Sequence, residues 1–142
     1  HSFRFWRPAS DDPKLVEPAQ NALRTVGLAD RANIIVRNLS HGEHRQLEIA
    51  MALATGPKLL LLDEPMAGMG AEESQKMVSI LNQLKGNHTI LLIEHDMDAV
   101  FALADQITVL VYGKSIASGT PVEIRGNEEV RTAYLGEEGA AD

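Results

Sequence analysis

The sequence contains no cysteine among its 142 residues, so disulfides, thiolate metal sites and thiol catalysis are excluded. It also lacks a basic cluster that could follow a phosphate backbone, and its formal net charge is −7, which disfavours direct nucleic-acid binding. No apolar run approaches the roughly 20 residues that span a bilayer, and nothing at the start resembles a signal peptide. These absences predict a cytosolic protein that could contact a membrane only through a partner.

The residues that are present suit a compact globular chain. Hydrophobic residues make up 44% and charged residues 23%, which is ordinary for a soluble domain. Periodicity and capping signals predict several helices, which are expected at 18–26, about 40–55, 72–85, 97–104, from Thr120, and 127–135. Strands are expected at 59–62 and 89–93, followed by a hairpin of 106–111 with 115–117.

The strands at 59–62 and 89–93 are continuously apolar between chain breakers, which is typical of strands buried on both faces of a parallel sheet. Strands and helices alternate along this part of the chain. The predicted fold class is therefore α/β, with a mostly parallel sheet flanked by helices.

Both apolar strands end in residues that can do chemistry. In open α/β sheets, ligands bind beyond the carboxyl ends of the strands. Asp63 and Glu64 suit Mg²⁺ held beside a phosphate, with the second carboxylate orienting a water, although Asp63 could equally cap the next loop while Glu64 is solvated. The second strand ends in Glu94 and His95, and a lone histidine there is more often structural than a phosphate contact.

A third candidate lies at Leu39-Ser40-His41-Gly42-Glu43. Ser40 and Glu43 have the S-x-x-E form of a capping box at the start of a helix. The free amides and the dipole of such a helix favour an anion. Taken alone, the capping box is the simpler interpretation.

Two further patterns are set aside. Gly113-Lys114-Ser115 has the G-K-S ending of a phosphate-binding loop, but Thr108 stands where the first glycine is needed, so we interpret it as a hairpin turn. His41 and His44 lie beside acidic residues without a zinc-ligand spacing, and a charged helix surface is the better interpretation.

The order of these segments resembles the ABC-type ATPase family. The segment from Leu39 with LEIA at 47–50 resembles the family's signature motif and its helix. LLLLDEP at 59–65 resembles the Walker B strand, 67–70 falls at the D-loop, and 93–96 is similar to the strand with the switch histidine. The resemblance covers 39–138, and the helix before Leu39 fits the end of the family's helical subdomain.

Within the family, the sequence is most similar to the ATP-binding subunits of branched-chain amino acid importers. The cues are LEIA, DEPMAGM, LLIEHDM and the SGTP ending. Urea-importer ATPases share several of them and remain an alternative. The resemblance implies three regions: 1–38 as the partial end of the helical subdomain, 39–118 as the signature helix and α/β core, and 119–142 as C-terminal helices and tail.

The resemblance also implies roles for individual residues. Asp63 would help to hold Mg²⁺, Glu64 would be the general base, and His95 would contact the γ-phosphate of ATP. Ser40, Gly42 and Glu43 would bind ATP held mainly by an opposing ATPase subunit. Transmembrane permease subunits would be further partners and would place the protein on the inner face of the plasma membrane.

The sequence departs from the family pattern in several places. No G-x-x-x-x-G-K-S/T loop is present, so we expect a fragment with the phosphate-loop half missing and with little ATPase activity alone. His41 replaces a usual glycine, Glu43 replaces a usual glutamine and adds negative charge near the phosphate site, and Gly70 replaces the D-loop aspartate.

The missing half would leave a gap in the sheet between 90–93 and 107–110. Open apolar edges invite pairing with another chain, so the fragment is expected to close this gap, self-associate or swap elements. Two rival functions are an ABC-type ATPase of DNA repair or chromosome organisation and a non-catalytic module. The first lacks its coiled coils and basic surface here, and the presence of Asp63, Glu64 and His95 argues against the second.

Overall fold

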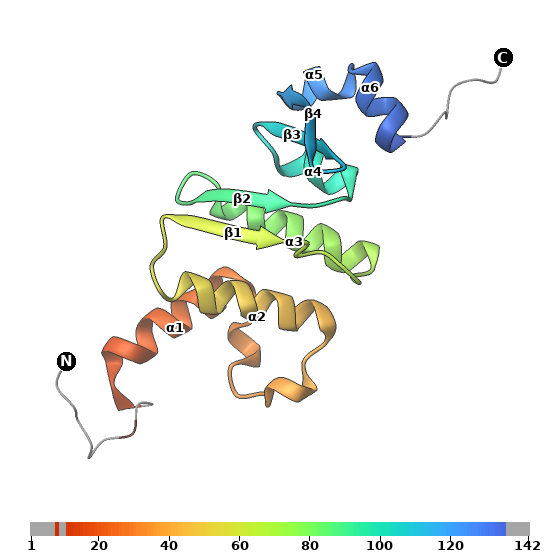
Figure 1. The fold of residues 1–142 in the computed structure, drawn as a ribbon. Helices are drawn as coiled ribbons and strands as arrows, with labels where there is room; N and C mark the ends of the chain where they lie inside the picture. Colours follow the sequence, from red (N-terminus) through yellow and green to blue (C-terminus); the bar gives the residue numbers. More distant parts are fainter. Residues whose placement is uncertain (1–7, 9–10, 136–142) are drawn as a thin grey trace. The chain divides into compact units, whose positions relative to one another are not determined.

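A computed structural model of the chain describes residue 8 and residues 11–135 (Figure 1). These residues fall into two compact units, divided between Glu94 and His95. The first unit contains α1 (Pro13–Thr25), two 3-10 turns (Ala29–Arg31 and Val36–Asn38), α2 (His41–Leu53), β1 (Leu59–Asp63), α3 (Ala71–Leu84) and β2 (Thr89–Ile93). The second contains α4 (Met97–Leu103), β3 (Ile107–Val111), β4 (Lys114–Gly119), α5 (Pro121–Arg125), α6 (Glu128–Val130) and a π-helical turn (Arg131–Leu135).

Helix α1 begins at Pro13 and not at the predicted Pro18. Proline suits the first position of a helix, where its missing N–H has no intrahelical acceptor to lose. The Asp12 carboxylate caps this end by accepting the Lys14 N–H at 3.0 Å. Pro18 therefore lies inside the helix, which continues through it. The prediction placed the start too late because an interior proline usually breaks a helix.

Strands β1 and β2 pair in parallel, with Leu61 opposite Leu91 and Asp63 opposite Ile93. This confirms the parallel arrangement that the two apolar runs predicted. Helix α3 lies along one face of the pair (Figure 1). Its side of the core contains Leu60 from β1 and, from α3, the buried residues Met77, Ile80, Leu81 and Leu84.

The prediction that these strands are buried on both faces was wrong for this chain. Alternate side chains of a strand point to opposite faces of the sheet. The residues that alternate with the covered ones are exposed to solvent: Leu59 by 51%, Leu61 by 68%, Leu91 by 58% and Ile93 by 58%. The β1–β2 pair therefore has one covered face and one apolar face open to solvent, which we call the open apolar face.

The second unit is built around the predicted hairpin. Strands β3 and β4 are antiparallel, and both residues of their turn, Tyr112 and Gly113, have positive φ, at 48° and 75°. Two consecutive residues of this kind form the tight turn that matches the twist of a hairpin. The G-K-S sequence thus lies in a turn and a strand, as predicted. The buried core beneath consists of Ile107, Val109, Ile124 and Val130.

Among the described residues, no helix is both long enough and apolar enough to cross a membrane. The part of the predicted C-terminal tail that follows Leu135 lies outside the described residues.

Candidate functional site

The predicted capping box at the start of α2 is confirmed. Ser40 is the N-cap, and its Oγ accepts the Glu43 N–H at 3.2 Å. In return, Glu43 Oε2 accepts the Ser40 N–H at 2.8 Å. Because serine and glutamate satisfy each other's backbone N–H groups, the helix starts at a defined residue.

The next amides of α2 are left without partners. In the part of the chain that the structure describes, the N–H groups of His41 and Gly42 have no hydrogen-bond acceptor. Unpaired amides at a helix N-terminus carry a partial positive charge that favours an anion. The start of α2 can therefore accept an anion through the backbone of these two residues.

The Glu43 side chain is directed toward Arg31 rather than toward an incoming anion. Arg31 Nε lies 2.8 Å from Glu43 Oε1, and the same guanidinium donates to Oε2 at 3.3 Å. The negative charge of Glu43, which we expected to lie near the predicted phosphate site, is therefore paired with Arg31. Sequence reasoning missed Arg31 because it lies in a 3-10 turn that no periodic pattern announces.

The pKa of the Glu43 carboxyl is lowered from its ordinary value. The Ser40 N–H lowers this pKa most, partial burial acts in the opposite direction, and Arg31 lowers it further. The unfolded chain therefore binds more protons at Glu43 than the folded chain does. The resulting stabilisation is present at neutral pH and is lost as the pH falls through the folded-state pKa.

Replacing Glu43 by Gln is expected to flatten the loss of stability of the first unit between about pH 5 and pH 3. Glutamine keeps an acceptor for the Ser40 N–H but does not titrate. Urea midpoints measured across this range would test the change. Glu48→Gln removes the same charge from the same helix and is the matched control; equal pH dependence in the two variants would contradict the assignment.

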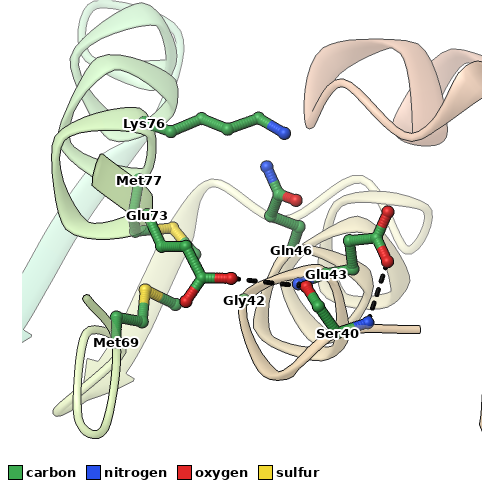
Figure 2. Close-up of a pocket in the computed structure, with 8 residues that line it drawn as sticks. All are labelled: Ser40, Gly42, Glu43, Gln46, Met69, Glu73, Lys76 and Met77. Carbon is green, nitrogen blue, oxygen red and sulfur yellow. Dashed lines mark hydrogen bonds between the residues drawn. The ribbon is translucent and has the colours of Figure 1, made fainter. Parts of the chain in front are cut away.

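A small pocket of about 50 Å³ opens beside the start of α2 (Figure 2). Residues of α2 line one side, and residues of α3 with the preceding loop line the other. The lining residues are Ser40, Gly42, Glu43, Gln46, Met69, Glu73, Lys76 and Met77. Gln46 is 3% exposed and donates to the Val26 carbonyl at 3.1 Å, so it joins α2 to the end of α1.

His41 connects the start of α2 to the loop that follows β1. Its Nε2 lies 3.0 Å from the Ala67 carbonyl oxygen. A carbonyl can only accept, so Nε2 carries the proton and donates. The residue that replaces a usual family glycine thus adds a direct link between the segments that resemble the signature motif and the D-loop.

Asp63 and Glu64 lie at the carboxyl end of β1, where the sequence predicted them. Both side chains are exposed. Glu64 has φ of 45°, the left-handed region that costs a non-glycine residue on the order of 1 kcal/mol. Its N–H donates to the Ile93 carbonyl at 2.8 Å, so the end of β2 holds this conformation. Such strained residues are found most often at functional sites.

Glu94 has a structural contact that its sequence position did not predict. Its Oε1 accepts the Met66 N–H at 3.1 Å and so ties the end of β2 to the loop after β1. His95 is the first residue of the second unit and is exposed. It precedes α4, whose N-cap is Asp96.

The described residues could hold Mg²⁺ only if phosphate oxygens and water supplied the remaining ligands. Among them, no group of three or more histidine, aspartate or glutamate side chains could hold a metal ion alone. Mg²⁺ in nucleotide sites is commonly bound by one or two carboxylates together with phosphate oxygens and water. An exposed Asp63 at the end of a strand suits that arrangement.

The comparisons with known proteins agree with this geometry. The ABC transporter family model matches residues 6–67, and the model of the branched-chain amino acid ATP-binding cassette transporter matches residues 114–140. A solved structure, the ADP conformation of MJ1267, an ATP-binding cassette of an ABC transporter, is similar with a TM-score of 0.80 and 29% identity. That match covers 95% of this chain and 54% of the other. Sequence and fold together show that the chain belongs to the ABC transporter family of ATP-binding proteins.

Several relatives are named as branched-chain amino acid transport proteins. The high-affinity branched-chain amino acid transport ATP-binding protein LivG of Salmonella typhimurium is 44% identical over 124 residues, which cover 86% of this chain and 49% of LivG. The corresponding protein BraF of Pseudomonas aeruginosa is 42% identical, with the same coverage of 86% and 49%. The chain spans about half the length of these curated relatives.

Proposed function

We propose that this chain supplies part of the ATP-hydrolysing subunit of an importer for branched-chain amino acids. The observation that carries the proposal is that the first unit contains both an element that can bind an anion and an element that can help to hold a metal ion. The first is the start of α2 with unpaired amides, and the second is the exposed Asp63 and Glu64 at the end of β1. The relatives named for branched-chain amino acid transport support the transported class. The alternatives are the ATPase of an importer for urea or another amino acid or amide, and a non-catalytic ABC-like module.

In this proposal, each predicted residue has one task. Asp63 holds Mg²⁺ beside the phosphates, where the ion offsets the charge that develops on phosphoryl transfer. Glu64 orients a water and takes its proton, and His95 contacts the γ-phosphate. The α2 N-terminus, with Ser40, Gly42 and Glu43, binds the γ-phosphate of ATP held by an opposing subunit.

The proposed partners are a second ATPase subunit and transmembrane permease subunits. A second ATPase subunit would complete each nucleotide site, and transmembrane permease subunits would hold the pair at the inner face of the membrane. Residues 1–38 would end the helical subdomain, 39–118 would form the core, and 119–142 would form the C-terminal region.

The proposal is tested by adding the half that carries the phosphate-binding loop. We expect the chain alone to hydrolyse no ATP above background, because it lacks the lysine and amides that cradle the phosphates. Co-expression with a separate polypeptide that carries the phosphate-binding loop of an ABC-type ATPase is expected to give Mg²⁺-dependent phosphate release. The same polypeptide without this chain is the control, and a complex that forms but shows no turnover would contradict the proposal.

A further inference from the structure

Glu73 brings a carboxylate from the first turn of α3 to the N-terminal end of α2 (Figure 2). Ser40 Oγ donates to Glu73 Oε1 at 3.4 Å. A Cβ placed on Gly42 would lie 2.8 Å from the same oxygen and 2.9 Å from the carboxylate carbon. The carboxylate therefore packs against the Gly42 backbone, in space that only a glycine leaves open.

The carboxylate lies beside the end of α2 that is open to an anion. The N–H groups of His41 and Gly42 are the unpaired amides described above, and the helix dipole adds positive potential at the same end. Ser40 supplies a hydroxyl to the carboxylate, as it would to a phosphate oxygen. Glu73 thus contacts Ser40 and packs against Gly42, two residues that the proposed function assigns to the γ-phosphate, without accepting a hydrogen bond from the unpaired amides.

The charges around the pocket leave Glu73 weakly held. Glu43 is paired with Arg31, whereas Glu73 takes part in no salt bridge among the described residues. Lys76 is the remaining charged residue that lines the pocket. A single long hydrogen bond and the helix end hold the carboxylate, so a stronger anion can replace it.

We infer that the Glu73 carboxylate is an internal competitor for phosphate at the start of α2. This inference rests on the proposed function of that helix. Glu73 and a phosphate cannot occupy the same position, and their like charges repel at contact distance. Binding of phosphate therefore requires Glu73 to turn away from Ser40 and Gly42.

The release of Glu73 needs no change of the backbone. The carboxylate is the flexible end of the side chain, and rotation about its own bonds carries it from Gly42 toward solvent. Glu73 lies in the first turn of α3, which itself favours an acidic residue, so the released carboxylate remains in a favourable place. Weak anions leave the Glu73 carboxylate in contact with Ser40 and Gly42, whereas the γ-phosphate of ATP displaces it.

The test is a titration of the 142-residue chain with inorganic phosphate at constant ionic strength. The amide signals of His41 and Gly42 in nitrogen-15 NMR spectra report on binding at the start of α2. Glu73→Gln removes the charge and keeps the side-chain length. The Glu73→Gln variant is expected to bind phosphate about fivefold more tightly. This factor corresponds to removing the repulsion between two like charges in contact in a medium with the dielectric constant of water.

Glu72→Gln is the matched control. It makes the same change in the same turn of α3, but Glu72 is exposed and does not line the pocket. Its phosphate affinity is expected to stay within about twofold of the wild-type value, because exposed charges are largely screened by salt. A second variant, Glu73→Asp, keeps the charge but shortens the side chain, and its affinity is expected between those of wild type and Glu73→Gln. It also gives a result if Glu73→Gln does not fold.

Three outcomes would overturn the inference. They are equal affinities for the Glu73→Gln and Glu72→Gln variants, weaker binding by Glu73→Gln, and no response of Gly42 to phosphate in any variant. The ATP hydrolysis of the complex with the loop-bearing half tests the proposed function independently. If the complex hydrolyses ATP but the phosphate titration shows no effect of Glu73→Gln, the inference about Glu73 is wrong and the proposed function still holds.

Discussion

Replacing Glu64 by Gln is expected to lower the ATP turnover of the reassembled enzyme by about 10²- to 10⁴-fold, the range for loss of a general base. The carboxylate of Glu64 would take the proton of the attacking water, and an amide cannot. Glutamine keeps the length of the side chain and meets the same backbone φ of 45°, so the change isolates the charge. Steady-state phosphate release at saturating ATP and Mg²⁺ measures the effect.

The variant should still bind nucleotide, because its loss lies in the chemical step. A matched measurement of ATP binding would therefore show little change in affinity. Glu72→Gln, which removes a carboxylate from the exposed side of α3, is the control and should keep full turnover. Turnover by Glu64→Gln within a few-fold of the wild type would exclude Glu64 as the base.

The open apolar face of the β1–β2 pair is expected to make the isolated chain self-associate. Leu61 and Leu91 are 68% and 58% exposed and lie directly opposite each other in the register. Burial of one leucine side chain contributes about 1.5–3 kcal/mol. Changing both to serine should therefore weaken association by on the order of 10²-fold or more.

Sedimentation of the wild-type chain and the double variant over a range of concentrations would test this expectation. Val122→Ser is a suitable control, because Val122 is 80% exposed but lies in α5 of the second unit. A wild-type chain that stays at its monomer mass of 15.5 kDa at every concentration would contradict the prediction. Co-expression with the loop-bearing half should suppress association, if that half covers the same face.

Local signals in the sequence were sufficient for much of the fold. The capping box at Ser40 could be predicted because both of its partners lie within one turn. The hairpin at Gly113 could be predicted because no helix follows the G-K-S residues. The apolar runs of β1 and β2 identified two strands, but their composition says nothing about which part of the chain covers each face. The exposure of Leu61 was therefore missed.

The candidate site was predictable only where its contacts are local. Asp63 and Glu64 were found because they follow an apolar strand. Glu73 reaches Ser40 across 33 positions of sequence, and only the packing of α3 beside α2 brings them together. An acidic residue in the first turn of a helix is ordinary, so nothing in the sequence distinguished Glu73 from Glu72.

The contact between His41 and the loop after β1 has a consequence for how this sequence can evolve. The imidazole Nε2 would lie 3.2 Å from a Cβ at Gly68, where φ is 76°. A side chain at position 68 would thus meet both backbone strain and the histidine ring, so the two positions are not free to vary independently. Among related sequences, we expect a bulky ring at position 41 to occur together with glycine at position 68. A glycine at position 41 would remove the steric contact with position 68, but the positive φ there would still favour glycine.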